Sequence, residues 1–332
     1  MKRKIILMIS MVSLVAVLLS IHYGNYNTIK IDIGYQSVTS QTWGALIMKN
    51  KGFFYNKLKE AYPDKKIKVV WHDEISGSVI NTSMIMGKVQ FGFMGDMPLI
   101  LNMYKSATLK NFNSKLVAMD GKGINGHNQS ILIPRNSKIK TIEELKGKTI
   151  STPIGSSAHY MLMKVLEKYG MLDVVNIVHQ DVAISNQLLS TNKTDAFAIW
   201  EPYPSFLEKE QSGKILINGD ESNIDYLAGI IVDNNFAKKN KKVIKLFIES
   251  LEESHEFIKE NPDEAAKIFA KESGFDFSVV QKAVENINWE TKIEDKDIET
   301  LINKQNFLID IKQVKSFDLR DYIYRGDKWW AQ

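Results

Sequence analysis

Residues 155–160, Gly-Ser-Ser-Ala-His-Tyr, combine the groups that bind a small oxyanion. They follow an expected strand that ends at 150–152 and open an amphipathic helix that stops at Gly170. The first turn of such a helix offers unpaired backbone N–H groups at the positive end of the helix dipole. Two serine hydroxyls accompany them, together with a histidine that lies off the apolar stripe. The predicted anion contacts are Gly155, Ser156, Ser157 and His159.

Four more polar clusters follow expected strands, at the strand ends where open α/β sheets bind ligands. Several of these residues also have ordinary structural interpretations, as helix caps, core aromatics or surface acids. Glu201 would suit a ligand that carries an amine, because a buried carboxylate needs a partner. The clusters are Gln36 with Thr42 and Trp43; Ser76, Gly77 and Ser78; Gly95 with Asp96; and Trp200 with Glu201.

Signatures of catalysis and of metal binding are few. The sequence has no glycine-rich phosphate loop, no dinucleotide fingerprint and no His-Glu-x-x-His motif. Its six histidines are dispersed without metal-ligand spacing, and the absence of cysteine excludes disulfides and thiolate ligands. We therefore expect a protein that is not an enzyme and that has no cofactor and no metal.

Length and charge narrow the class further. A chain of 332 residues fits two lobes, and 44% hydrophobic with 25% charged residues is typical of a globular protein. Three of the 43 basic residues stand at positions 2–4, so the rest of the chain is nearly neutral against 39 acidic residues. This balance argues against a nucleic-acid partner, which would need a concentrated basic face.

The N-terminus has the pattern of a targeting segment. Lys2-Arg3-Lys4 precedes an uncharged, largely apolar run from Ile5 to Ile21, which predicts a signal peptide or a membrane anchor within residues 1–28. Ile21 stands where a lipoprotein would have its lipid-bearing cysteine, so lipidation is excluded. We expect an exported protein at the extracytoplasmic face of the membrane or in the periplasm, with membrane contact only through this segment.

Strands and helices alternate after residue 28, which favours an α/β architecture with mostly parallel sheets. Two glycine-rich or polar crossings, near 120–128 and 218–226, bracket the central segment. They predict a discontinuous first lobe (29–122 and 224–332) and an inserted second lobe (128–218). Strands are expected at 29–35, 66–71, 90–94, 116–119, 130–134, 150–152, 174–179, 195–200, 214–217 and 227–232, and helices at 45–51, 77–86, 95 onward, 158–169, 185–190, 240–260, 262–273, 277–287 and 295–309, with a capping box at 141–144.

These clusters, in this order, resemble the substrate-binding proteins of ABC importers for sulfonates, taurine and nitrate. The resemblance covers residues 30–325. Its most specific parts, Phe-Gly-Phe-Met-Gly-Asp-Met-Pro at 91–98 and Gly-Ser-Ser-Ala-His at 155–159, are most similar to the aliphatic-sulfonate branch. Ile-Trp-Glu-Pro at 199–202 and Asn-Pro-Asp-Glu-Ala-Ala at 261–266 are shared more widely, and His159-Tyr160 is also similar to the taurine branch.

The resemblance implies a two-lobed type 2 periplasmic-binding-protein fold with a ligand cleft between the lobes. It also implies a monomer that delivers its ligand to ABC permease subunits with a cytoplasmic ATPase. A sulfonate would lie against Ser156, Ser157 and the helix N-terminus with His159 nearby, while first-lobe groups close over it by hinge motion. Trp43 and Trp200 would pack its organic tail.

Other ligands and roles stay open from the sequence. The same architecture could bind taurine, nitrate or bicarbonate, or a thiamine-precursor pyrimidine, or it could serve as a membrane-tethered sensor lobe. The fungal pyrimidine-precursor synthases share this fold, but they carry a cysteine-rich motif and this chain has no cysteine.

Overall fold

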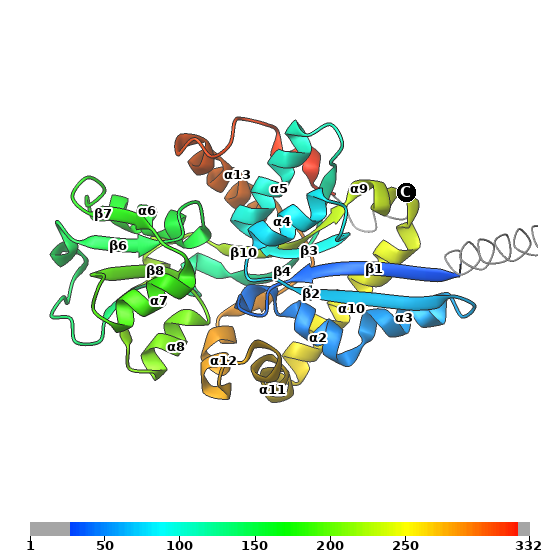
Figure 1. Ribbon diagram of the computed structural model, residues 1–332, viewed down its shortest axis with the longest axis horizontal. Coiled ribbons are helices and arrows are strands. Elements are labelled where there is room, and N and C mark those ends of the chain that lie inside the picture. Colours follow the sequence, from blue (N-terminus) through cyan, green and yellow to red (C-terminus); the bar gives the residue numbers. More distant parts are fainter. Residues whose placement is uncertain (1–26, 325–332) are drawn as a thin grey trace, which may run out of the picture.

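Two mixed β-sheets lie side by side in the computed structural model, which describes residues 27–324 (Figure 1). The first, with strand order β11-β4-β10-β3-β1-β2, draws on both ends of the described chain, and the second, β7-β6-β8-β5-β9, lies within residues 129–218. The first sheet comprises β1 (Thr28–Tyr35), β2 (Lys66–Asp73), β3 (Phe91–Gly95), β4 (Ser114–Gly123), β10 (Tyr226–Asp233) and β11 (Ile287–Trp289). The second comprises β5 (Gln129–Pro134), β6 (Thr149–Thr152), β7 (Asn176–His179), β8 (Ala196–Trp200) and β9 (Gly213–Asn218).

Helices cover both faces of the first sheet and surround the second. We call each sheet with its helices a unit. The first unit has α2 (Gly44–Lys51), α3 (Phe53–Ala61), α4 (Gly77–Ile85), α5 (Asp96–Thr108), α9 (Asn234–Lys239), α10 (Lys241–Glu260), α11 (Pro262–Ser273), α12 (Phe277–Val284) and α13 (Asp295–Asp310). The second has α6 (Ser157–Lys168), α7 (Val182–Ser190) and α8 (Tyr203–Lys209). In Figure 1, α13 lies above the junction of the two units and α11 and α12 lie below it.

Alternate side chains of β3 point to opposite faces of the first sheet, and a separate hydrophobic core packs against each face. Phe91 and Phe93 face α2 and α10, where Phe91 stacks on Phe247 with ring centroids 4.1 Å apart. Met94 points to the opposite core, which α4, α5 and α13 complete. A Cβ on Gly92 would lie 2.8 Å from Ile80 Cγ2, so the glycine allows α4 to pack closely.

The sheets are mixed, so the prediction of mostly parallel sheets was wrong. Within residues 27–324, β1–β2, β1–β3, β6–β7 and β6–β8 pair in parallel, whereas the other five strand pairs are antiparallel. The antiparallel pairs involve β10 and β5, or join β11 to β4. The chain passes from the first sheet into the second at β5 and returns to the first at β10. Each of these strands runs antiparallel to both of its neighbours.

Several expected elements have different bounds, and four helices or strands were missed. The helix expected at 277–287 ends at Val284, because residues 287–289 pair with β4 as edge strand β11. The helices α3, α8 and α9 were not predicted. The expected capping box at 141–144 is absent: residues 142–145 form a single 3-10 turn, and Glu144 Oε2 accepts the Lys140 N–H at 2.8 Å.

The strand expected at 116–119 also extends further than predicted, because β4 continues through Gly121 and Gly123. Gly123 pairs with Tyr226 and Ile287 in the two neighbouring strands. A Cβ on Gly121 would lie 2.7 Å from the carbonyl oxygen of Gln41. The glycine that we expected to end the strand instead lets the loop after β1 approach it.

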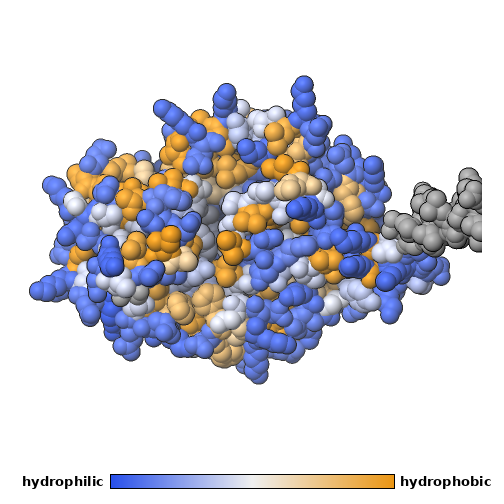
Figure 2. Space-filling model, viewed as in Figure 1, coloured by the Kyte–Doolittle hydropathy of each residue, from blue (hydrophilic) through white to orange (hydrophobic). Residues whose placement is uncertain are grey.

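On the face shown in Figure 2, hydrophilic residues alternate with small hydrophobic groups. Within residues 27–324 no helix combines the length and apolar character that a membrane span requires. Of the leader predicted at 1–28, all but residues 27 and 28 lies outside the described residues.

Candidate ligand-binding site

The N-terminus of α6 lies where the two units meet. Gly155 adopts φ +81°, a left-handed conformation that favours glycine, and thereby turns the chain from β6 into α6. Ser156 is the N-cap, and its Oγ accepts the backbone N–H of His159 at 3.2 Å. The helix begins at Ser157, one residue before the predicted start. The geometry of an anion-binding helix N-terminus is therefore present.

His159 is a buried neutral side chain. Its Nδ1 accepts the backbone N–H of Gly155 at 3.2 Å, which leaves the ring proton on Nε2. The ring packs edge-on against Phe307 of α13, with centroids 5.1 Å apart. Burial lowers its pKa to about 4, so the imidazole offers a hydrogen bond but no positive charge at neutral pH. His159 lies off the apolar stripe of α6 and is buried all the same, because α13 covers this side of the helix.

Ser157 does not present a free hydroxyl. Its Oγ donates to Asp96 Oδ1 at 2.5 Å, and both side chains are buried. Asp96 comes directly after β3 of the first unit, so this bond joins the two units. Gly95 precedes it, and a Cβ there would lie 3.6 Å from the Tyr226 hydroxyl. The structure thus brings Gly95, Asp96 and Ser157 together.

The cluster after β1 is largely committed to internal contacts. Gln36 Nε2 donates to the Phe93 carbonyl at 3.4 Å, and Thr42 Oγ1 donates to the Gln36 carbonyl at 2.8 Å. The Trp43 indole donates to the Ser37 carbonyl and packs on Phe269, and its side chain is fully buried. In this arrangement the Trp43 side chain packs in the core of the first unit and supports the loop after β1 from there.

Ser76, Gly77 and Ser78 lie at the start of α4. The two serine hydroxyls contact each other at 2.8 Å, and a Cβ on Gly77 would lie 2.5 Å from Pro98 Cβ. The glycine is needed for the close packing of α4 on α5. No polar contact joins these described side chains to the second unit, and the structure does not bring them to the Ser157 contact.

Glu201, which follows Trp200 at the end of β8, contacts the loop after β1 through its backbone carbonyl. The Glu201 carbonyl accepts both the backbone N–H of Ser40 at 3.3 Å and the Ser40 hydroxyl at 3.2 Å. Ser40 Oγ also lies 3.0 Å from Gln41 Oε1. This second contact between the units involves Ser40 and Gln41, which the sequence interpretation missed. Their position directly before Thr42-Trp43 was the available signal.

Two buried nitrogens, one at the end of β8 beside Glu201 and one in the loop after β1, have no partner among the described residues. They are the indole Nε1 of Trp200, which can only donate, and the amide Nε2 of Gln41. Buried polar groups in proteins are nearly always paired, and those that are not call for a water, an ion or a ligand. Two N–H donors suit an acceptor such as an oxyanion.

The Glu201 side chain faces a polar pocket of about 210 Å³ beside the crossings between the units. Its carboxylate accepts the Ser205 hydroxyl at 2.9 Å and the Ser205 backbone N–H at 3.3 Å. Burial nevertheless raises its pKa to about 7. The pocket is lined by His127, Asn128, Gln129, Ser130, Glu201, Ile215, Asn218, Gly219, Asp220, Lys282 and Asn286.

The raised pKa of Glu201 predicts a pH-dependent stability. The unfolded carboxyl titrates near 4.5, so the protonated form favours folding, and stability falls as pH rises through about 7. Glu201→Gln should therefore gain about 2–3 kcal/mol over the wild type between pH 5 and pH 8, measured by urea unfolding. The exposed Glu210→Gln is the control. The same pH dependence in all three proteins would contradict the prediction.

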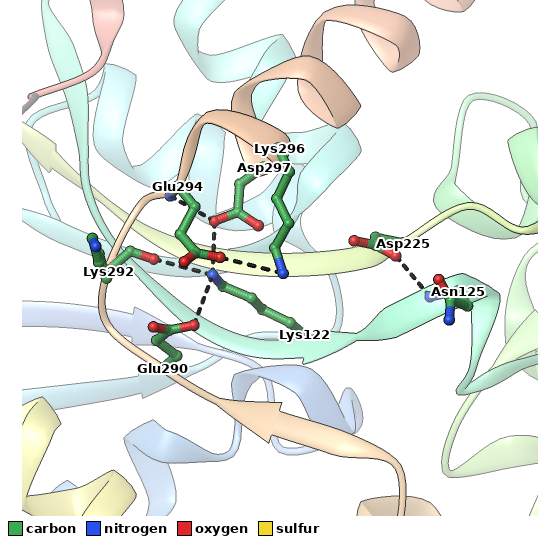
Figure 3. A network of polar contacts seen from close by, with 8 residues as sticks. All are labelled: Lys122, Asn125, Asp225, Glu290, Lys292, Glu294, Lys296 and Asp297. Carbon is green, nitrogen blue, oxygen red and sulfur yellow. Dashed lines mark hydrogen bonds and ion pairs between the residues drawn. The ribbon is translucent and has the colours of Figure 1, made fainter.

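Polar contacts at and beside the crossings include one buried ion pair and one exposed hydrogen bond (Figure 3). Lys122, at the end of β4, is fully buried and pairs with Asp297 at 2.7 Å and with Glu290 at 3.3 Å. Asp225 Oδ1 accepts the backbone N–H of Asn125 at 2.7 Å and so ties the second crossing to the first. The sequence interpretation did not identify Lys122, because a lysine in a strand carries no sign of burial.

Comparison with known proteins identifies the family. A family model described as "NMT1/THI5 like" matches residues 51–265. The chain belongs to this family. Relatives of this NMT1/THI5-like protein include the "Putative aliphatic sulfonates-binding protein" of Bacillus subtilis, 27% identical over 83% of this chain and 79% of that protein. The Escherichia coli protein of the same name is 25% identical over 75% of this chain and 73% of its own length.

Solved structures agree on the fold. The alkanesulfonate-binding protein SsuA from Xanthomonas axonopodis pv. citri, bound to MOPS, superposes with a TM-score of 0.75 at 20% identity. The match covers 90% of this NMT1/THI5-like chain and 98% of that protein. The α/β architecture and the resemblance inferred from the sequence are confirmed. No group of three or more acidic or histidine side chains within residues 27–324 has the arrangement of a metal site.

Proposed function

We propose that this chain is an extracytoplasmic solute-binding protein that captures an aliphatic sulfonate between its two units and delivers it to an ABC permease. The observation that carries the proposal is the buried indole N–H of Trp200, which has no partner among the described residues. Gln41, in the loop after β1 that contacts Glu201, supplies a second unpaired donor. Several relatives bear the name of sulfonate-binding proteins, which supports the choice of ligand.

Neutral donors are sufficient for this ligand. A sulfonate carries a single charge, and N–H groups bind it through charge-assisted hydrogen bonds without a buried arginine. The N-terminus of α6 and the neutral His159 add further donors on the second unit. No bond of the ligand is made or broken in this role, and the named relatives are binding proteins rather than enzymes.

In this proposal the two units are the lobes, with boundaries at 29–122 with 224–332 and at 128–218. The crossings near 120–128 and 218–226 serve as the hinge. The segment 1–28 directs export and either anchors the protein or is removed. The protein works as a monomer that presents its closed form to the permease subunits and their cytoplasmic ATPase.

A ligand panel tests the proposal. Thermal shift and calorimetry would compare ethane-, butane- and hexanesulfonate and isethionate with taurine, sulfate, nitrate, bicarbonate and a pyrimidine. An alkanesulfonate at about 100 times its dissociation constant should stabilise the fold by about 2.7 kcal/mol, while nitrate should not. If no sulfonate stabilises the protein, the assignment is wrong. A preference for taurine over ethanesulfonate would favour the aminosulfonate alternative and assign the amine to Glu201.

A further inference from the structure

We propose that Asp96, Ser157 and Lys304 form a latch that stabilises the closed arrangement of the two units before any ligand binds. The inference concerns the protein without ligand and goes beyond the proposed function. It rests on that function only in taking closure of the two units to serve ligand capture. It assigns Ser157 to Asp96 instead of to the anion. It also gives Lys304, a residue without any assigned role, a positioning function.

The Asp96 carboxylate has four hydrogen-bond partners, two on each oxygen. Oδ1 accepts the backbone N–H of Met97 at 2.8 Å and the Ser157 hydroxyl at 2.5 Å. Oδ2 accepts the backbone N–H of Leu227 at 2.9 Å and the Lys304 ammonium. Three of these donors belong to the first unit, and only Ser157 belongs to the second.

Lys304 pairs with this carboxylate. Its side chain projects from α13 and is 1% exposed, and Nζ also donates to the Asp225 carbonyl at 2.7 Å. The lysine therefore compensates the charge of Asp96 and fixes it against the second crossing. A hydroxyl that donates to a charged acceptor forms a stronger bond than one between neutral groups.

The Ser157 bond joins two units whose cores are separate apart from Tyr160, and it acts alongside the contacts of Ser40 with Glu201 and of α8 with α12. α6 buries Met161, Leu162 and Val165 in the core of the second unit, whereas α5 packs in the first. Tyr160 reaches across to Phe307 of α13, with centroids 4.9 Å apart, and guides the approach of the helix. Since a serine hydroxyl has one proton, Ser157 cannot donate to an anion while it donates to Asp96.

The test measures closure in the absence of ligand. The sequence contains no cysteine, so Met86→Cys and Leu172→Cys, exposed residues of the first and second units, would be the only labelling sites for fluorescence energy transfer. Ser157→Ala in this background should shift the empty protein about tenfold toward the open form. Amide exchange at Ser40, whose N–H donates to the Glu201 carbonyl across the junction at 3.3 Å, should accelerate about tenfold and reports opening even where the open form is rare.

Ser212→Ala is the control. Its hydroxyl donates to the Leu207 carbonyl at 3.3 Å within the second unit, so transfer efficiency and exchange at Ser40 should match the wild type. Ser157→Thr keeps the hydroxyl and should retain closure. If Ser157→Ala leaves both readouts unchanged in the empty protein, the latch does not exist. Because no ligand is present, that failure would be separate from failure of the ligand panel.

Discussion

Replacing Lys122 with methionine should lower the free energy of unfolding by about 3–5 kcal/mol. Lys122 and Asp297 are both fully buried and lie 2.7 Å apart. Methionine fills much of the space of the lysine stem but removes the charge, so Asp297 is left buried with the Glu294 backbone N–H as its remaining partner. Urea unfolding monitored by circular dichroism measures the loss.

Two further variants define the origin of this effect. Lys296→Met removes the lysine of an exposed pair with Glu294 and should change stability by less than about 1 kcal/mol. Asp297→Asn in the Lys122→Met background removes the uncompensated charge, keeps an acceptor for Glu294 and should recover part of the loss. A Lys122→Met protein as stable as the wild type would show that the network around the crossings contributes little.

Trp200→Phe should weaken binding of the alkanesulfonate that the panel selects by about 10- to 100-fold. The change keeps an aromatic ring and removes only the unpaired indole N–H, and a hydrogen bond to a charged group contributes about 1.5–3 kcal/mol. Gln41→Leu should weaken binding to a similar extent, and the double variant more than either. Calorimetry measures each dissociation constant.

Trp71→Phe is the matched control, because Trp71 lies in β2 and packs on Tyr35 and Phe93 within the first unit. Its affinity should equal that of the wild type. If the affinity is unchanged in both Trp200→Phe and Gln41→Leu, the anion binds at another part of the junction. Loss of folding in either variant would be visible as a lowered melting temperature without ligand.

The sequence by itself determined the α/β class, the two crossings and the clusters after the strands. These features depend on local rules: hydrophobic periodicity identified most strands and helices, and Gly155-Ser156 marked the start of α6 within one residue. The family resemblance also followed from short motifs at 91–98 and 155–159, and the comparisons confirm it.

Only the tertiary structure decided how these residues share their hydrogen bonds. Ser157 appeared as a free hydroxyl in the sequence, and it became the partner of Asp96 because β3 and α6 meet across the junction. Trp43 was expected at the ligand and is packed behind the loop, while Lys122 and Lys304 are buried against carboxylates far along the chain. Burial and long-range pairing depend on which segments the fold brings together, and spacing along one chain does not carry that information.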